Sequence, residues 1–266
     1  MKIGIVGCAG RMGQMLLREV LATPGAMLGG GTERSDSPAI GKDIGELVGA
    51  AHAGIAAIDD PVALFAAVDA VIDFTAPTAT LKHLELAVQS GKALVIGTTG
   101  MDAAQKEIIA QAAQKAPIVF APNMSVGVTL AMAVVEQVAK ILDDSYDIEI
   151  VEMHHRHKVD APSGTALGLG LAAAKGRGVD LDKVACKARD GHTGARPKGE
   201  IGFATLRGGD VVGDHSVIFA ADGERFEITH KASSRQVFAK GAVRAALWLK
   251  GKPPGLYTMR DVLGFS

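Results

Sequence analysis

The chain begins with a short apolar run that leads into a glycine-rich loop and then into a helical pattern. Lys2–Val6 has the length and composition of a buried strand. Glycines recur every third residue over residues 7–13, and apolar residues then repeat at helical intervals up to residue 21. In this order, strand, loop and helix typically hold the pyrophosphate of a dinucleotide at a helix N-terminus. The start of the chain therefore predicts a Rossmann-like parallel sheet.

The glycine loop is followed at the expected distance by an acidic residue. Glu33 stands about 20 residues beyond the loop, where the adenosine ribose of a dinucleotide is held. Arg34 beside it is a partner for a 2′-phosphate, so NADH or NADPH is the expected cofactor. A plain glycine turn and a solvated charge pair are the alternative interpretations, and Ala9 departs from the general fingerprint, which has a glycine there. The residues expected to contact the cofactor are Gly7, Cys8, Ala9, Gly10, Arg11, Met12, Glu33 and Arg34.

The next hundred residues alternate between strand and helix patterns. Strands are expected over residues 70–74 and 93–96, and helices over residues 78–90 and from Asp102, where Gln105 completes a capping box. Ligands of open parallel sheets lie beyond the carboxyl ends of the strands. Two loops that follow expected strands are therefore candidate nicotinamide contacts, although turn chemistry alone also explains them. Their residues are Gly97, Thr98, Thr99, Ala121, Pro122, Asn123 and Met124.

The second half of the chain predicts a separate sheet. Strand patterns cover residues 146–153, 200–206, 211–219 and 224–230, and Asp222-Gly223 is a hairpin signal between the last two. A later helix ends at residues 251–254 and is expected to return to the first domain. We therefore predict an α/β protein with a Rossmann-like nucleotide-binding domain and a smaller α+β domain with a mixed sheet. The expected domains are 1–125 with 235–266, and 126–234.

Composition narrows the function classes. A hydrophobic fraction of 48% with only 4% aromatics and 33 glycines favours an aliphatic core with many turns, as in α/β proteins. The net charge of −1 gives no general attraction to nucleic acid or to anionic membranes. No run approaches the roughly 18 apolar residues of a membrane span. The two cysteines have no disulfide or metal-site spacing, so we expect a cytoplasmic protein.

Proton donors and positive charges are concentrated immediately after residues 146–153. Three histidines, an arginine and a lysine occupy residues 154–158, and Pro162-Ser163-Gly164-Thr165 then starts a helix. Free amides at a helix start bind carboxylate or phosphate, and histidine and lysine transfer protons near neutral pH. If extended geometry persists, His155 and His157 share one face of the strand and His154 and Arg156 share the other. The pattern predicts an anionic-substrate site and leaves open which histidine is catalytic; a solvated loop is the alternative for any one of them.

Two other functions fit parts of this pattern. His155-Arg156-His157 is similar to the H-x-H motif of metal-dependent amidohydrolases, with Asp160 as a further ligand. That motif belongs to the first strand of a barrel, whereas a nucleotide-binding half precedes it here, so we expect no metal. A nucleotide-sensing module without catalysis is the second alternative, and it leaves the cationic cluster unexplained.

Together these motifs resemble the dihydrodipicolinate reductase family, also called 4-hydroxy-tetrahydrodipicolinate reductase, of diaminopimelate and lysine biosynthesis. The resemblance covers almost the whole chain and is carried by residues 7–13, 97–100, 123–127, 152–166 and 207–213. It implies that NADH or NADPH delivers a hydride to C4 of a cyclic, conjugated imine that bears two carboxylates. The 4-hydroxyl leaves as water in the overall reaction.

The resemblance also implies residue roles and an assembly. His154 is the implied general acid/base, and Lys158 is the second proton donor and carboxylate partner. His155 is an implied substrate contact, and Gly164 and Thr165 bind a carboxylate through the helix start. The implied partner is a small dicarboxylate substrate, and neither nucleic acid nor a membrane is implied. The implied assembly is a homotetramer built through the sheet of the second domain. That domain then serves both substrate binding and oligomerisation.

Overall fold

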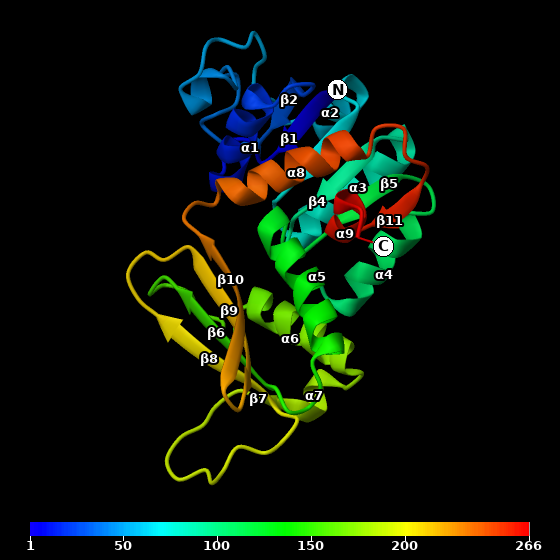
Figure 1. Cartoon of the computed structure of the whole chain (residues 1–266). Coiled ribbons are helices and arrows are strands. Elements are labelled where there is room, and N and C mark those ends of the chain that lie inside the picture. Colours follow the sequence, from blue (N-terminus) through cyan, green and yellow to red (C-terminus); the bar gives the residue numbers. More distant parts are fainter. Residues whose placement is uncertain (266) are drawn as a thin grey trace. The chain divides into compact units, whose positions relative to one another are not determined.

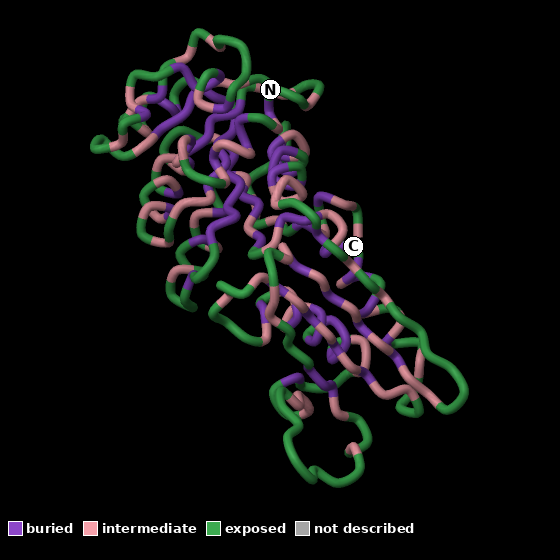
Figure 2. Tube along the Cα trace, turned by 90° about the vertical axis from the view of Figure 1, so that its left-hand side faces the viewer, coloured by how far each residue is buried: buried purple, intermediate pink, exposed green. Residues whose placement is uncertain are grey.

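A computed structural model describes residues 1–265 of the chain (Figure 1). Its contacts divide the chain into two compact units, each with its own sheet and core. The first unit comprises Met1–Val126 and the segment from Arg235 onward, and the second comprises Gly127–Ser234. Buried residues are concentrated in the strands and in the helices that cover them, whereas the long loop over residues 187–200 is mostly exposed (Figure 2).

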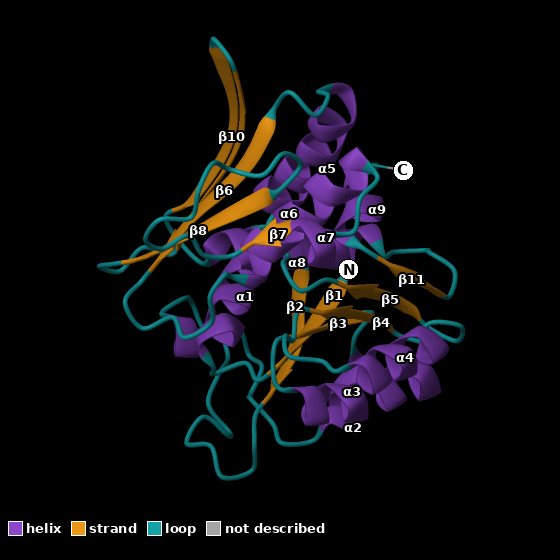
Figure 3. Cartoon of the chain, turned by 90° about the horizontal axis from the view of Figure 1, so that it is seen from below, coloured by secondary structure: helices purple, strands orange, loops and turns teal. Residues whose placement is uncertain are grey.

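The first unit is a six-stranded parallel sheet covered by helices on both faces (Figure 3). The short central strands are apolar except for Asp73 at the end of β3, as burial on both faces requires. Side chains on one face pack against α1 and α8, and those on the other face pack against α2, α3 and α4. In spatial order the strands are β11 (Gly255–Tyr257), β5 (Pro117–Phe120), β4 (Ala93–Ile96), β3 (Ala70–Asp73), β1 (Lys2–Val6) and β2 (Met27–Thr32).

The helices of this unit follow the sequence patterns closely. The capping box at the start of α4 is confirmed, because Asp102 and Gln105 each accept a hydrogen bond from the other's backbone amide. The late helix packs in the first unit, where Ala242 and Val243 of α8 share a core with Leu16 and Leu17 of α1. The helical segments are α1 (Arg11–Ala22), η1 (Glu46–Val48), α2 (Pro61–Ala67), α3 (Pro77–Ser90), α4 (Ala103–Ala112), α8 (Gln236–Trp248) and α9 (Met259–Leu263).

The second unit has a mixed sheet of five strands, one more than the four expected. The additional strand is β7, which has only two residues. Strand β6 lies between β8, which is parallel to it, and β9, which is antiparallel, and β9 and β10 form the hairpin predicted at Asp222-Gly223. The strands are β6 (Asp147–His154), β7 (Ala185–Cys186), β8 (Ile201–Arg207), β9 (Gly213–Ala221) and β10 (Glu224–Ala232), with helices α5 (Val126–Ile141), α6 (Gly164–Arg177) and α7 (Leu181–Val184).

One face of β6 changes character along its length. Its buried positions are Ile148, Ile150, Glu152 and His154, in strict alternation. Both isoleucines join the aliphatic core formed with α5 and α6. At the carboxyl end of the strand, the same buried face carries two ionisable side chains, which need partners to be buried stably. This end of β6 is therefore the natural centre of a chemical site.

Candidate functional site

The glycine loop of the first unit joins β1 to α1 at very short range. A Cβ atom at Gly13 would lie 2.0 Å from the carbonyl oxygen of Gly7, so only glycine permits this approach of helix and loop. The N-cap of α1 is Gly10, and no side chain in residues 1–265 caps this helix. Its first amides are thus available to an anion such as a pyrophosphate. The residues present fit a bound dinucleotide.

Glu33 lies directly against this loop. Its Oε1 accepts a hydrogen bond of 2.9 Å from the amide of Ala9, which joins the expected ribose ligand to the expected phosphate loop. Arg34 is exposed, with its Nε 3.6 Å from Asp36 Oδ1. Cys8 is buried, and burial together with the charge of Glu33 raises the pKa of its thiol to about 11. Cys8 is therefore a protonated packing residue at neutral pH and not a nucleophile.

Replacing Glu33 with alanine is expected to weaken NADH binding more than NADPH binding. The carboxylate accepts from ribose hydroxyls in NADH, whereas the 2′-phosphate of NADPH replaces one of them. A lost hydrogen bond to a charged group corresponds to roughly a 10- to 100-fold weaker Kd for NADH. Fluorescence titration with both nucleotides measures the effect, with Glu107→Ala on the exposed face of α4 as the matched control. Equal losses for both nucleotides would contradict the ribose role.

The two loops expected at the nicotinamide lie beyond the carboxyl ends of β4 and β5, which are neighbours in the sheet. Thr98 is buried, and its hydroxyl accepts a hydrogen bond of 2.8 Å from Thr80, so this side chain supports the loop. Thr99 is exposed and available to a ligand. Ala121 and Met124 are buried, whereas Pro122 is exposed and Asn123 is partly exposed. The structure brings all these positions to the same edge of the sheet as the glycine loop.

A buried ion pair not expected from the sequence supports this edge. Asp73, at the end of β3, accepts a hydrogen bond of 2.8 Å from Nδ1 of His83 on α3. It also accepts hydrogen bonds from the amide and hydroxyl of Thr75. Burial raises the pKa of Asp73, but the hydrogen bonds and charge of its partners more than offset it and hold the pKa below its usual range.

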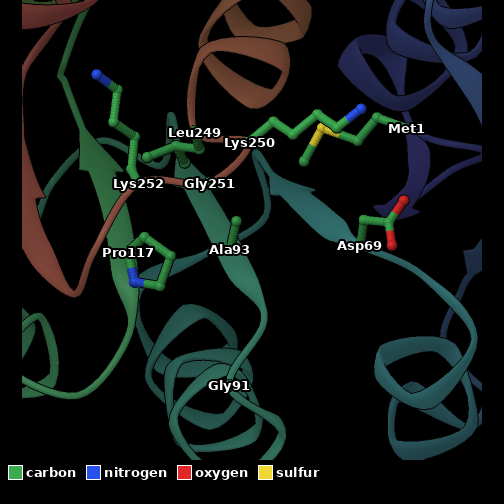
Figure 4. A pocket seen from close by; sticks show the side chains of 9 residues that line it. All are labelled: Met1, Asp69, Gly91, Ala93, Pro117, Leu249, Lys250, Gly251 and Lys252. Carbon is green, nitrogen blue, oxygen red and sulfur yellow. The ribbon is translucent and has the colours of Figure 1, made fainter.

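A cavity of about 360 Å³ lies at the other end of this sheet, where the strands begin. Figure 4 shows that its lining comes from the starts of the strands, such as Ala93 and Pro117, and from the turn after α8, including Lys250 and Lys252. Ligands of open parallel sheets bind at the carboxyl ends of the strands. The cavity is therefore separate from the expected cofactor site.

The candidate site of the second unit is centred on Glu152. Its carboxylate is almost fully buried and accepts hydrogen bonds from His154 Nδ1 at 2.6 Å and from the amide of Ser163 at 3.0 Å. Arg207, on the neighbouring strand β8, donates to both of its oxygens at 2.7 and 3.0 Å. Burial raises the pKa of Glu152, but the hydrogen bonds from Arg207 and His154 outweigh it and hold the pKa below its usual range.

The residues after β6 form a turn, so the expected sharing of strand faces is wrong. The strand ends at His154, whose carbonyl accepts from the amide of Gly208, and beyond it the amide of Arg156 donates to the carbonyl of Gly209. His154 is buried while Arg156 is exposed. His155 and His157 do lie near each other, with ring centroids 6.3 Å apart, through the turn.

Lys158 and the start of α6 follow this turn. The Lys158 ammonium bonds to both carboxylate oxygens of Asp160 at 2.7 and 2.9 Å, and that pairing lowers the pKa of Asp160. Ser163 is the N-cap of α6, and its hydroxyl accepts from the amide of Ala166. Gly164 at the first helical position is exposed, and Thr165 follows it in the same turn. The second unit thus brings together all of its predicted site residues.

His215 was not predicted from the sequence, yet it completes the cluster. It pairs in register with Glu152 across β9 and β6, and its ring meets that of His154 edge-on at 5.0 Å. Its Nε2 lies 3.0 Å from the Ser163 hydroxyl. Burial, then the charge of His154, lowers the pKa of His215 to about 4. The imidazole is therefore neutral at physiological pH.

This low pKa predicts an acid-sensitive fold. The unfolded chain protonates His215 near pH 6.5 and the folded chain near pH 4, so stability falls as pH drops through this window and is unaffected above it. The full effect is on the order of 3 kcal/mol. Urea unfolding across the window measures it. His215→Gln should remove this part of the pH dependence, whereas His192→Gln in the exposed loop should keep it; equal pH dependence in both variants would contradict the assignment.

Glu152, Ser163, Arg207 and His215 received no chemical role from the sequence. A usable signal exists in β6, where Ile148 and Ile150 are followed at the same two-residue spacing by Glu152 and His154. An apolar face that continues as charged residues indicates a buried polar site. The positions of Arg207 and His215 beside Glu152 depend on the pairing of β6 with β8 and β9, for which the sequence carried no signal.

Two absences concern the described part of the chain. Within residues 1–265, no group of three or more His, Cys, Asp or Glu side chains is arranged to hold a metal ion. In the same range, every helix is too short or too polar to cross a bilayer.

A nucleotide-type glycine loop on a parallel sheet, joined to a unit with a buried carboxylate–histidine cluster, defines a nucleotide-dependent oxidoreductase of two units. The chain belongs to the dihydrodipicolinate reductase family. The family's N-terminal model matches residues 1–124 and its C-terminal model matches residues 127–263. The resemblance found in the sequence is confirmed.

Individual relatives agree with this assignment. The chain is 56% identical to 4-hydroxy-tetrahydrodipicolinate reductase 1 of Mesorhizobium japonicum, covering 100% of this chain and 98% of that one. It is 54% identical to 4-hydroxy-tetrahydrodipicolinate reductase of Magnetococcus marinus, covering 100% and 99%. The dipicolinate-bound dihydrodipicolinate reductase from Paenisporosarcina sp. TG-14 shares the fold, with a TM-score of 0.76, 23% identity and 98% coverage of each chain. The predicted fold class, the NAD(P)H-dependent reductase activity and the cofactor are confirmed.

Proposed function

We propose that the chain reduces 4-hydroxy-tetrahydrodipicolinate to tetrahydrodipicolinate with NADH or NADPH, in diaminopimelate and lysine biosynthesis. The observation that carries this proposal is the cluster at the end of β6. There a buried histidine, an ammonium group and a helix start lie within one short segment of a chain of this family. The Paenisporosarcina relative binds dipicolinate, a planar dicarboxylate, which supports a substrate with two carboxylates.

The second unit supplies the groups that bind and protonate the substrate. Lys158 pairs with one carboxylate, and the amides of Gly164 and Thr165 hold the other at the positive end of the α6 dipole. His155 contacts the substrate beside them. His154 and Lys158 supply one proton for reduction of the conjugated system and one for departure of the 4-hydroxyl as water, and the substrate returns one proton as the water leaves. The overall reaction consumes one NAD(P)H and one proton and releases NAD(P)⁺ and water.

The first unit binds the cofactor, which supplies the hydride to C4 of the substrate when bound. The amides of Arg11 and Met12 face the pyrophosphate at the start of α1, with Gly7, Cys8, Ala9 and Gly10 forming the turn before it, in which the Gly10 amide donates to the Gly7 carbonyl. Glu33 and Arg34 face the adenosine ribose. Gly97–Thr99 and residues 121–124 hold the nicotinamide. The uncapped start of α1 and the contact between Glu33 and Ala9 support this arrangement.

We also propose a cytoplasmic homotetramer assembled through the sheet of the second unit. Phe226 of the edge strand β10 and Ile141 of α5 are large, exposed apolar residues that line one cavity of about 230 Å³. Such surfaces favour contact between copies of a chain. The unpaired thiols of Cys8 and Cys186 fit a reducing compartment, and the net charge of −1 fits a small-molecule partner and neither nucleic acid nor membrane. Light scattering in solution tests the tetramer.

The reaction is tested by following NAD(P)H absorbance with the condensation product of pyruvate and aspartate semialdehyde, formed in place by the upstream synthase. We expect nucleotide oxidation that requires both precursors and persists in the presence of a chelator. Binding of nucleotide without oxidation would instead indicate a sensor. Substrate turnover that needs no nucleotide and is abolished by the chelator would indicate a metal-dependent hydrolase.

A further inference from the structure

Both oxygens of the Glu152 carboxylate are fully engaged by hydrogen-bond donors. Oε2 accepts from His154 Nδ1 and from one Arg207 nitrogen, at 2.6 and 2.7 Å. Oε1 accepts from the other Arg207 nitrogen and from the amide of Ser163, each at 3.0 Å. The side chain is only 1% exposed, so these contacts replace the water it would otherwise bind. The guanidinium balances its charge in the bidentate geometry that suits a carboxylate.

These contacts determine which nitrogen of His154 carries the proton. With Arg207 in place, Glu152 is ionised, and an ionised carboxylate only accepts hydrogen bonds. Nδ1 of His154 must therefore be the donor. In the neutral ring Nε2 is then unprotonated. In the charged ring Nε2 carries the proton that can be transferred. A Cβ at Gly213 would lie 3.0 Å from Nε2, so the glycine leaves space beside this atom.

The same carboxylate holds the start of α6. Its bond to the amide of Ser163 fixes the residue that caps the helix, immediately before Gly164 and Thr165. Arg207 also donates to the carbonyl of Asp160 at 2.6 Å, and Asp160 in turn pairs with Lys158. The proton donor, the ammonium group and the helix start are thus all connected to the Glu152–Arg207 pair.

We propose that Glu152 is a positioning residue of the reaction: it selects the Nδ1–H tautomer of His154, directs the exchangeable proton to Nε2, and fixes the start of α6 relative to it. Arg207 keeps the carboxylate ionised and in place. This inference rests on the proposed role of His154. The competing view is that the pair only braces β6 against β8 and has no influence on the tautomer.

The first test needs no mutation of the pair. Nitrogen-15 NMR of histidine-labelled protein distinguishes the two neutral tautomers, and comparison with His154→Gln assigns the signals of His154. We expect a protonated Nδ1 and a bare Nε2 in the neutral ring. A proton on Nε2 in the neutral ring would overturn the proposal, and because the tautomer is measured in the wild-type protein, poor folding of a Glu152 or Arg207 variant cannot obscure the result.

The second test compares Glu152→Gln with a matched variant on the same strand. Glu149→Gln also removes an arginine-bound charge, since Glu149 accepts from Arg189 and Arg196, but Glu149 is partly exposed and lies on the other face of β6 from His154. Misplacement of a catalytic group costs on the order of 100-fold in rate, so we expect Glu152→Gln to lower kcat by about that factor. Glu149→Gln should retain wild-type kcat.

The pH profile separates positioning from bracing. Without the carboxylate nothing selects the Nδ1–H tautomer of His154, so the pH profile of kcat should change in Glu152→Gln. A folded Glu152→Gln variant with wild-type kcat and an unchanged profile would overturn the proposal. The proposed function fails separately, if the wild-type protein does not oxidise NAD(P)H with the substrate at all.

Discussion

Replacing His154 with glutamine is expected to lower kcat by roughly 10²- to 10⁴-fold, the usual contribution of general acid–base catalysis. Glutamine preserves approximate size and a hydrogen bond to Glu152, but its amide has no proton to transfer near neutral pH. NADH and NADPH should still bind almost normally, because their expected contacts belong to the first unit, whereas His154 belongs to the second. Steady-state rates and a cofactor titration measure the two effects separately.

The matched control for this variant is His157→Gln. His157 lies three residues further along, in the exposed part of the same turn, and does not contact the Glu152 carboxylate. It should retain wild-type turnover. A His154→Gln protein with wild-type kcat would show that another group supplies the proton.

The first unit was largely readable from the sequence because its signals are local. Residues 70–72 and 93–96 are continuous apolar runs, as burial on both faces demands, and each strand is followed by a helix with its own start signal. Strand β11 was missed. It has three residues and lies directly after Pro253-Pro254, where the pattern indicates only the end of a helix.

The sequence predicted which kinds of side chain form the candidate site, but it did not predict how they are arranged in space. The cluster at residues 154–158 marks a cationic site through local sequence alone. The end of β6, however, lies against Gly208 and Gly209, which are more than 50 residues away in the sequence and bond to the backbone of His154 and Arg156. The contacts that surround His154 likewise depend on Arg207, which reaches Glu152 through the pairing of β6 with β8. Long-range strand register of this kind leaves no trace in local periodicity.

Replacing Lys158 with alanine is expected to impair both substrate binding and turnover. The Lys158 side chain is 20% exposed and is held by Asp160, whose side chain is 56% exposed, so Lys158 is kept ordered while the carboxylate beside it can yield to a substrate carboxylate. Loss of a hydrogen bond between charged groups corresponds to roughly a 10- to 100-fold increase in KM for the substrate. Loss of the second proton donor should lower kcat as well.

Lys158→Arg distinguishes these two contributions. Arginine keeps the positive charge and can pair with a carboxylate, but it does not give up a proton in proteins. Lys158→Arg should therefore bring KM for the substrate back toward the wild-type value while kcat stays low. Lys183 is an exposed lysine of the same unit, so Lys183→Ala should change neither constant. If Lys158→Ala alone shows wild-type kcat and KM, then Lys158 neither binds nor protonates the substrate, and the carboxylate must be held by the start of α6 without it.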